Sequence, residues 1–430
     1  METMVTPPPT AAVEPMRPVD AMWYWLATKF ATDQFLAYAF AGTPDSVEQA
    51  VDDVLERARR CADFGLRVRP HTLNLRFPDW VSGAPIGSHS VDVWPTAGLG
   101  WQQVLDSLAG LMQRQLDPRR NTWRLHVFRE VRDVPGHDGV ATVVVLQMTH
   151  ALGDGTRTAA LAAQLFGRAA APVPVEQAGR TRPLRDVVDA YRVRKRLARR
   201  RESGELPPEK PPVPALSTNA RPHGPSVLRT VACHRDQLPG PTVLVGALVA
   251  VSDALAGHLR DQGEDVSALT AEVAIAKPGK PTARNHFAVH GVGLYPDAPT
   301  TAERYARIIE DLMSIRRRDA QMPADARLAF DGVPAPVRWA GVWRLNPDDN
   351  WSMVRGNTVV SSVERGEADL SFGGCPVVLT ASYPSLMPMM GLTHGVHRIG
   401  DTVAISVHTT RSVIADVDAY LDRLTFVLRR

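Results

Sequence analysis

Apolar and polar positions along this chain follow two periods, one typical of β-strands and one typical of amphipathic helices. Short apolar or alternating runs predict strands over residues 34–41, 66–77, 123–131, 141–148, 228–233, 269–276, 287–294, 359–363, 377–383 and 402–409. Apolar residues that recur every three or four positions predict helices over residues 43–65, 101–116, 156–165, 243–259, 300–317 and 416–428. Thr43 is expected to cap the first helix, with Pro44 at its first position. Each half of the chain therefore mixes strands with helices, which indicates a mixed α/β fold.

The chain has 430 residues, more than a single hydrophobic core usually holds, so two domains are expected. Residues 1–16 carry a Pro triplet and no apolar core, which predicts a disordered tail. Residues 17–166 and 226–430 carry the strand and helix patterns and are predicted to form the two domains. Between them, residues 167–225 are rich in Pro, Arg and Ala and lack strand signals, so they are predicted to form a crossover.

One stretch, residues 143–156 (VVVLQMTHALGDGT), combines a buried-strand pattern with groups that carry chemistry. The apolar run delivers His150 to a sheet edge, and Asp154-Gly155 follows four residues later, where a helical pattern begins. Gly153 and Gly155 permit a tight turn. A histidine with a pKa near neutrality is the usual general base for taking a proton from an alcohol or amine.

Two other interpretations of this stretch stay open from the residues alone. His150 could be a hydrogen-bonded histidine at a strand end, with Asp154 capping the helix that follows. A zinc site needs three or four ligands, and no other cluster of His, Cys or Asp has ligand spacing; His394 and His397 are expected to lie in a polar loop. The run 279–282 (GKPT) lacks the leading Gly and the Lys-Ser/Thr pair of a P-loop, so it predicts no nucleotide site.

Three further motifs, the last in two parts, support a family resemblance. Residues 17–23 (RPVDAMW) resemble the motif S-P-x-D-A-x-F, and residues 115–126 (QLDPRRNTWRLH) are similar to p-L-D-r-x-r-P-L-W. Residues 284–287 (RNHF) and 293–296 (GLYP) resemble G-N-x followed by L-P. Together with His150-x-x-x-Asp-Gly, these motifs resemble the wax ester synthase/diacylglycerol acyltransferase family, part of the chloramphenicol acetyltransferase-like and condensation-domain superfamily. The resemblance runs from about Pro18 to the C-terminus.

This resemblance implies two chloramphenicol acetyltransferase-like domains, each a mixed sheet with flanking helices, and an active-site tunnel between them. It implies that His150 is the general base that takes the acceptor hydroxyl proton while that oxygen attacks the thioester of an acyl-coenzyme A. Asp154 is then structural, pairing with an arginine to hold the loop, and Gly155 lets the helix start close to the substrate. No metal and no cofactor besides acyl-coenzyme A, the substrate, is implied.

The chain departs from the family pattern where substrate contacts are expected. Thr149 replaces the first of two adjacent histidines, residues 242–245 replace an Asn-Asp pair, and residues 361–366 keep little of the turn S-N-V-P-G-P. The residues expected to contact substrate are Thr149, Gly153, Asn285, Ser361 and Ser362. The acceptor is expected to be a long-chain alcohol or a diacylglycerol. The alternatives are a biosynthetic enzyme with a small hydroxyl or amine acceptor, and a non-catalytic homologue that binds acyl chains.

Composition adds expectations about compartment and partners. A net charge of +3 argues neither for nor against an anionic partner, and three widely separated cysteines fit a reducing cytoplasm. The basic segment 189–201 is either a solvated helix face or a peripheral contact with a membrane or lipid droplet. It lacks interleaved aromatics, so nucleic acid is not expected as a partner. The apolar run 243–251 is too short to cross a bilayer, so any membrane contact is expected to be peripheral.

Overall fold

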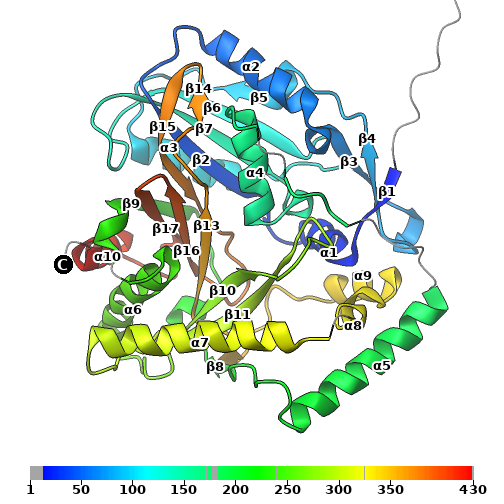
Figure 1. Ribbon diagram of the computed structural model, residues 1–430. Coiled ribbons are helices and arrows are strands. Elements are labelled where there is room, and N and C mark those ends of the chain that lie inside the picture. The colour runs from blue at the N-terminus through cyan, green and yellow to red at the C-terminus, as the bar shows by residue number, and fades with distance from the viewer. Residues whose placement is uncertain (1–12, 170–171, 177–182, 239, 324, 429–430) are drawn as a thin grey trace, which may run out of the picture.

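The computed structural model describes residues 13–169, 172–176, 183–238, 240–323 and 325–428, and two six-stranded sheets form its frame (Figure 1). Across the first sheet the strands are β14 (Ser371–Phe372), β15 (Cys375–Ser382), β2 (Gln34–Ala41), β7 (Ala141–Met148), β6 (Trp123–Val131) and β5 (Val91–Val93). Only β5 and β6 pair in parallel there. Across the second sheet the strands are β11 (Phe287–Gly293), β10 (Thr270–Ala276), β13 (Thr358–Glu364), β16 (Leu392–Ile399), β17 (Thr402–Thr410) and β9 (Ser226–His234). In this sheet β10, β13 and β16 run parallel.

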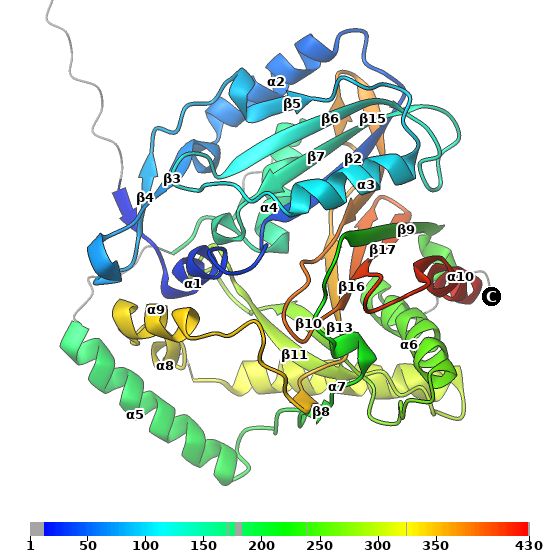
Figure 2. The same ribbon diagram turned by 180° about the vertical axis from the view of Figure 1, so that it is seen from behind.

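Helices cover both sheets, as Figures 1 and 2 show from opposite sides. On the first sheet, α2 (Val47–Arg60) and α4 (Gly155–Leu165) pack against one face, and α3 (Trp101–Met112) packs against the other. On the second sheet the packing helices are α6 (Val243–Asp261), α7 (Thr301–Gln321) and α10 (Val417–Leu428). Mixed sheets with flanking helices confirm the expected mixed α/β fold.

The remaining elements are short or peripheral. They are a small sheet of β1 (Val13–Pro15), β4 (Asp79–Ser82) and β3 (Leu66–Arg69), the pair β12 (Met353–Val354) and β8 (Val213–Pro214), and the helices α1 (Pro18–Leu26), α5 (Pro183–Glu202), α8 (Leu328–Asp331) and α9 (Ala335–Trp343). The expected disordered tail, residues 1–16, is therefore ordered from Val13, because β1 pairs with β4. Residues 1–12 lie outside the described part of the chain.

The strand that leads to His150 is central in the first sheet and buried along its whole length. On β2, its neighbour, Tyr38 and Phe40 face the core under α2 and α4, while Phe35 and Ala37 face the core under α3. Both faces of the sheet are thus apolar, which explains why β7 has a continuous apolar run and no alternation. Burial on both faces fixes the position at which β7 ends and the His150 turn begins.

The sheets do not follow the predicted domain boundary at residue 226. Strands β14 and β15 belong to the second half by sequence, yet β15 pairs antiparallel with β2 and completes the first sheet. The central strand β16 holds His394 and His397, both buried, so the polar loop expected there is wrong. Thr358 and Tyr420 satisfy the His394 ring at 2.9 Å and 2.8 Å, which is why a histidine is tolerated in this core strand.

Two helices bear on membrane contact. Helix α6 is long and apolar enough to span a bilayer, but 67% of the apolar stretch is buried, so it packs as the core helix of the second sheet.

Helix α5, which contains the basic segment 189–201, lies at the edge of the molecule and packs against α8 (Figures 1 and 2). Five of its arginines pair with carboxylates: Arg185 and Arg192 with Asp189 on the same helix, Arg196 with Asp325, Arg200 with Glu205 and Arg201 with Glu209. Peripheral membrane contact and a cytoplasmic location stay predictions.

Candidate active site

His150 begins a short turn, η4 (His150–Leu152), directly after β7 and Thr149. The half-buried imidazole stacks on the Trp23 ring from α1, with centroids 3.7 Å apart and planes 7° from parallel. Phe287, the first residue of β11, lies 6.2 Å from the imidazole on a third element. Burial lowers the pKa of His150 to about 4, against the opposing effects of its own backbone carbonyl, the Asp154 charge and Asn285. The imidazole is therefore neutral at pH 7 and able to accept a proton.

The tautomer of His150 follows from the contacts of Asn285, which precedes β11. The Asn285 Nδ2 donates to Asp20 Oδ1 at 2.9 Å and to the His150 carbonyl at 3.0 Å, so this amide nitrogen uses both hydrogens. The Asn285 Oδ1 then faces His150 Nδ1 at 3.0 Å and accepts from it. Because Nδ1 carries the proton, Nε2 of His150 holds the lone pair that a general base requires.

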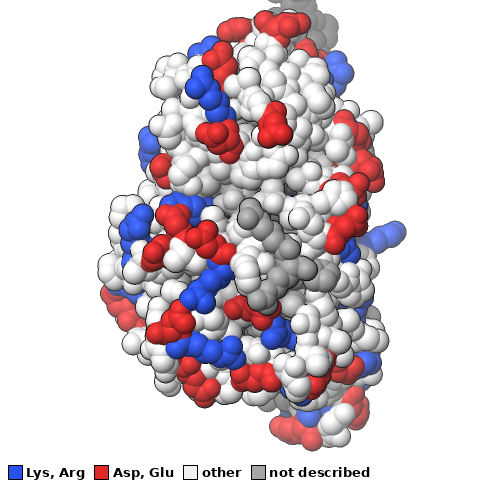
Figure 3. All heavy atoms as spheres, turned by 90° about the vertical axis from the view of Figure 1, so that its left-hand side faces the viewer, with Lys and Arg blue, Asp and Glu red and all other residues white. Residues whose placement is uncertain are grey.

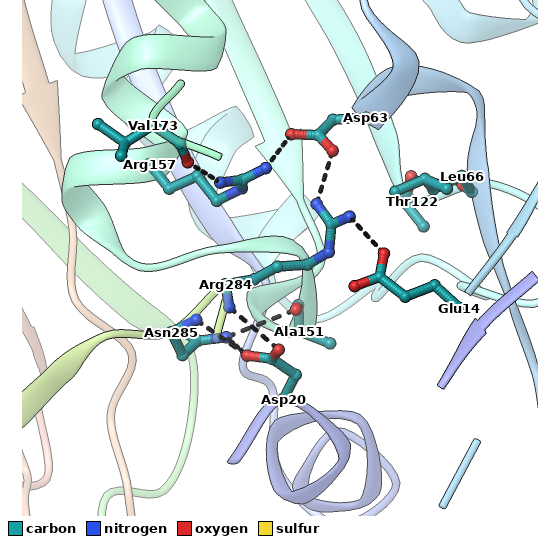
Figure 4. A network of polar contacts seen from close by, with 10 residues as sticks. All are labelled: Glu14, Asp20, Asp63, Leu66, Thr122, Ala151, Arg157, Val173, Arg284 and Asn285. Atoms are coloured by element: carbon teal, nitrogen blue, oxygen red, sulfur yellow. Dashed lines mark hydrogen bonds and ion pairs between the residues drawn. The ribbon is translucent and has the colours of Figure 1, made fainter. Parts of the chain in front are cut away.

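Asp20, on α1, anchors Asn285 from behind (Figure 4). Besides the Asn285 side chain, its carboxylate accepts the backbone N–H groups of Asn285 at 2.9 Å and Arg284 at 3.1 Å. Burial raises the pKa of Asp20 to about 6, although these hydrogen bonds oppose the rise, so Asp20 is mostly ionised at neutral pH. The result is a chain of contacts from Asp20 through Asn285 to His150 that orients the imidazole.

Asp154 holds two backbone segments together. One carboxylate oxygen accepts the N–H of Arg157 at 2.9 Å and so caps α4, while the other accepts the N–H of His286 at 2.7 Å. The sequence-based expectation that Asp154 pairs with an arginine side chain is corrected by these contacts, because both oxygens bind backbone amides. Asp154 thus fixes the turn that carries His150 against the segment that carries Asn285.

The arginine pairing expected of Asp154 is made instead by Asp63, on the short helix η1 (Ala62–Gly65). Figure 4 shows Asp63 between two guanidinium groups, with Arg157 at 2.5 Å and Arg284 at 2.6 Å. Arg284 also lies over the Trp80 ring, 5.2 Å from its centroid, and 3.6 Å from Glu14. These buried ion pairs join the first sheet's side of the molecule to the loop between β10 and β11, next to Asn285.

The two glycines of the motif lie where side chains do not fit. A Cβ on Gly155 would lie 2.7 Å from Val363 Cγ2 of β13, so a glycine is required for α4 to begin this close to the second sheet. The Gly153 carbonyl accepts a hydrogen bond from the Gln34 amide at 2.5 Å. Thr149 is buried, and its backbone N–H donates to the Thr122 carbonyl at 2.9 Å.

The other residues expected to contact substrate are placed differently. All polar groups of the Asn285 side chain are used by His150 and Asp20, so we assign Asn285 a positioning role in place of the expected substrate contact. Ser361 and Ser362 are half-buried on β13, beyond the point where β10 pairs with it. Within the described residues, neither hydroxyl bonds to His150, Asn285 or Asp20.

Sequence reasoning did not assign Asp20, Trp23 or Asp63 to the site. Asp20 and Trp23 stand three positions apart in the opening motif, and that helical spacing places both on one face of α1. This three-residue spacing could therefore have identified Asp20 and Trp23 from the sequence. Asp63 has no comparable signal, because its two arginine partners are 94 and 221 residues away. Among the described residues, no group of His, Cys, Asp and Glu has the arrangement of a metal site.

Comparison with known proteins agrees with this geometry. A sequence model of the wax ester synthase/diacylglycerol acyltransferase catalytic domain matches residues 16–286, more than half of the chain. Comparison with curated protein sequences gave no match. The solved wax ester synthase/diacylglycerol acyltransferase from Marinobacter aquaeolei VT8 is similar, with a TM-score of 0.62 and 18% identity. That alignment covers 96% of this chain and 98% of the Marinobacter chain.

Two further solved structures share the fold at lower identity. The trichothecene 15-O-acetyltransferase from Fusarium sporotrichioides aligns with a TM-score of 0.57 and 11% identity, over 97% of this chain and 94% of its own. A starter condensation domain of rhizomide synthetase, in complex with C8-CoA and Leu-SNAC, aligns with a TM-score of 0.56 and 11% identity, over 97% and 93%. The matched family model spans every element from α1 to Asn285 that builds the His150 site. The chain therefore belongs to the wax ester synthase/diacylglycerol acyltransferase family and is an acyltransferase with the condensation-domain fold.

Proposed function

We propose that this protein transfers a fatty acyl group from acyl-coenzyme A to a long-chain alcohol or a diacylglycerol, with His150 as general base. The observation that carries this proposal is the Nε2 lone pair of His150, which the hydrogen bond from Nδ1 to Asn285 Oδ1 leaves available. Trp23 and Phe287 give the imidazole apolar neighbours, which suit an acyl chain and a long-chain acceptor.

The reaction needs one proton transfer in each direction. His150 Nε2 takes the proton of the acceptor hydroxyl while that oxygen attacks the thioester carbonyl, and a tetrahedral intermediate forms. When the intermediate collapses, the carbon–sulfur bond breaks and the imidazolium returns its proton to the leaving thiolate. An ester and free coenzyme A result. The crystallised complex of the rhizomide starter domain with C8-CoA supports an acyl-coenzyme A donor for this fold.

The test is thiol release from palmitoyl-coenzyme A by the purified protein, with and without hexadecanol or diacylglycerol. We expect release that depends on the acceptor and falls at least about a hundredfold in His150→Ala, the usual share of a general base. His137→Ala, which removes a partly exposed histidine between β6 and β7, is the matched control and is expected to leave the rate unchanged. A His150→Ala protein with wild-type activity would refute the assigned base.

A second candidate function keeps the mechanism and changes the acceptor to a small hydroxyl or amine compound. Thr149 in place of the family's first histidine favours it, because this residue immediately precedes the base. The trichothecene 15-O-acetyltransferase is a fold relative whose name specifies a non-lipid acceptor. A screen in which hexadecanol and diacylglycerol give no product, while a small hydroxylated or amino compound does, would select this candidate. Family membership favours both enzymes over a non-catalytic homologue.

A further inference from the structure

Arg365 is a buried cation that lies outside the His150 site. It directly follows β13, and its side chain is only 4% exposed. Among the described residues no carboxylate lies at ion-pair distance from its guanidinium, whereas Arg398 on the neighbouring strand pairs with Glu364. On the face seen in Figure 3, blue and red side chains are likewise intermixed. Because arginine stays charged and a buried charge without a partner is costly, this position is suited to an anion that the protein does not supply.

Polar atoms of Arg365 and His397 are left without hydrogen-bond partners in the part of the chain that the structure describes. They are the Nε of Arg365 and the Nδ1 of His397, and both are buried. The Arg365 Nη1 donates to the Tyr38 hydroxyl at 3.4 Å, which is long for a hydrogen bond. Burial and the Arg365 charge lower the pKa of His397 well below its usual value, so this ring is neutral. Unsatisfied groups beside a buried cation favour a ligand with acceptor oxygens.

Arg365 faces the first sheet. On β13, Val360 packs with α6 in the core of the second sheet, so alternate positions such as Val363 and Arg365 lie on the opposite face. The contact of Arg365 with Tyr38 of β2 agrees with this placement. His397 of β16 is the partner of Val363 in the parallel pairing and therefore shares its face. The cation and the imidazole thus lie together between the two sheets.

The same face of β13 leads from Arg365 back toward the His150 turn. A Cβ on Gly155, five residues after His150, would lie 2.7 Å from Val363 Cγ2. Arg365 is two residues farther along the chain, which is roughly 7 Å of extended strand. Ser361 and Val363 on this face are partly exposed, so the face is accessible to a ligand. A ligand chain that lies along β13 can therefore reach from the turn of the base to the guanidinium.

The sequence shows that this charge is a feature of the chain itself. Residues 361–366 (SSVERG) stand where the family pattern has the turn S-N-V-P-G-P, and position by position Arg365 takes the place of its glycine. A glycine offers no side chain to a ligand at this position. The substitution therefore places a cation where the pattern has none, and a difference in substrate is expected to follow from it.

We infer that Arg365 binds the carboxylate of one reactant, whose chain lies along β13, and that His397 contacts the same carboxylate. The inference rests on the proposed acyl transfer, and it adds that one reactant carries a carboxylate at the end remote from its reacting group. Because His397 is neutral, Arg365 balances a single negative charge, which matches a carboxylate better than a phosphate dianion. The planar guanidinium also has the geometry that binds a carboxylate through two hydrogen bonds.

The test compares compounds that differ only in a terminal carboxylate. The donor pairs are adipoyl- against hexanoyl-coenzyme A and suberoyl- against octanoyl-coenzyme A, each with hexadecanol. The acceptor pairs are ω-hydroxyhexanoate against hexanol and ω-hydroxydodecanoate against dodecanol, each with palmitoyl-coenzyme A. We expect kcat/KM of the wild type to favour the carboxylated compound roughly tenfold in at least one pair, because a site built for a polar group disfavours the analogue without it. Preference in the donor pairs assigns the carboxylate to the acyl chain, and preference in the acceptor pairs assigns it to the alcohol.

Variants attribute this preference to Arg365. Arg365→Met, which keeps an apolar chain without the charge, is expected to lower the ratio of the two kcat/KM values about tenfold, and Arg365→Lys is expected to retain part of it. Arg398→Met removes a partly exposed arginine from the adjacent strand and is the matched control, in which the ratio is kept. The inference is overturned if the wild type prefers no carboxylated compound, or if its preference survives Arg365→Met or falls equally in Arg398→Met. The wild-type ratios decide alone if Arg365→Met does not fold.

A binding measurement distinguishes failure of this inference from failure of the proposed function. Adipate and ω-hydroxyhexanoate are expected to raise the Tm of the wild type and of His150→Ala, but not that of Arg365→Met. Binding that depends on Arg365, without transfer from any donor, would refute the proposed function and leave the carboxylate site standing. Transfer that requires His150, with no carboxylate preference and no Tm shift, would do the reverse.

Discussion

Replacing Asn285 by alanine tests whether this residue orients the base or binds substrate. The change removes the acceptor of the His150 Nδ1 proton at 3.0 Å and the donor to the His150 carbonyl at 3.0 Å. Each hydrogen bond contributes about 1 kcal/mol net, so the stabilisation of the oriented imidazole falls by about 2 kcal/mol. If this loss falls on the transition state, kcat drops about thirtyfold. Because the side chain has no group left for substrate, KM is expected to change less than about twofold.

The assay is steady-state ester formation with the donor and the acceptor varied separately. Asn219→Ala is the matched control, because Asn219 is also buried and donates to the Gly356 and Met389 carbonyls, at 3.0 Å and 2.9 Å, away from His150. It is expected to lower the urea midpoint without lowering kcat. A tenfold rise in KM with unchanged kcat in Asn285→Ala would refute the positioning role and restore the expected substrate contact.

Three further predictions follow from the geometry of the site. Burial lowers the pKa of His150 to about 4, so the neutral base is present above that pH. Measured by ester formation, kcat/KM should therefore fall as the pH drops, with an apparent pKa near 4. An apparent pKa near 6.5 would contradict this prediction. Asp63→Asn leaves two buried arginines without their carboxylate and should cost about 3–5 kcal/mol, seen as a lower urea midpoint; an unchanged midpoint would show that the ion pairs are dispensable. Gly155→Ala should cost about 1–3 kcal/mol through the contact with Val363, and adding Val363→Ala should recover most of that loss; a double variant no more stable than Gly155→Ala would argue against a steric cause.

Local patterns in the sequence predicted the elements that carry the motif. The strands over residues 34–41, 123–131 and 141–148 have the predicted bounds. The first and third are long, mostly apolar runs, as expected in a sheet covered on both faces. The helix predicted over residues 43–65 begins later than expected, because a different residue caps it. Ser46, not Thr43, accepts from the Gln49 N–H and begins α2, so Pro44 lies outside it.

The contacts that orient His150 could not be read from local patterns. Asn285 is 135 residues from His150, and Asp20 is 265 residues from Asn285, so only the tertiary fold brings them together. The family resemblance pointed to all three stretches and gave His150 the role of general base, but it assigned no role to Asp20 and no positioning role to Asn285. The polar loop expected at His394 was wrong for a related reason: Thr358 and Tyr420, on other elements, bond its ring within a core strand, and a single sequence does not reveal such partners.

The crossing of β15 into the first sheet has a consequence for biosynthesis. Thr380 of β15 bonds to Ala37 of β2, 343 residues earlier in the chain. While the ribosome makes the intervening segment, β2 presents an apolar edge with unpaired backbone groups, a form prone to intermolecular pairing. The N-terminal half therefore does not mature first as an independent unit. Both halves reach the native state together, late in translation, and fragments that stop within residues 167–225 are expected to aggregate.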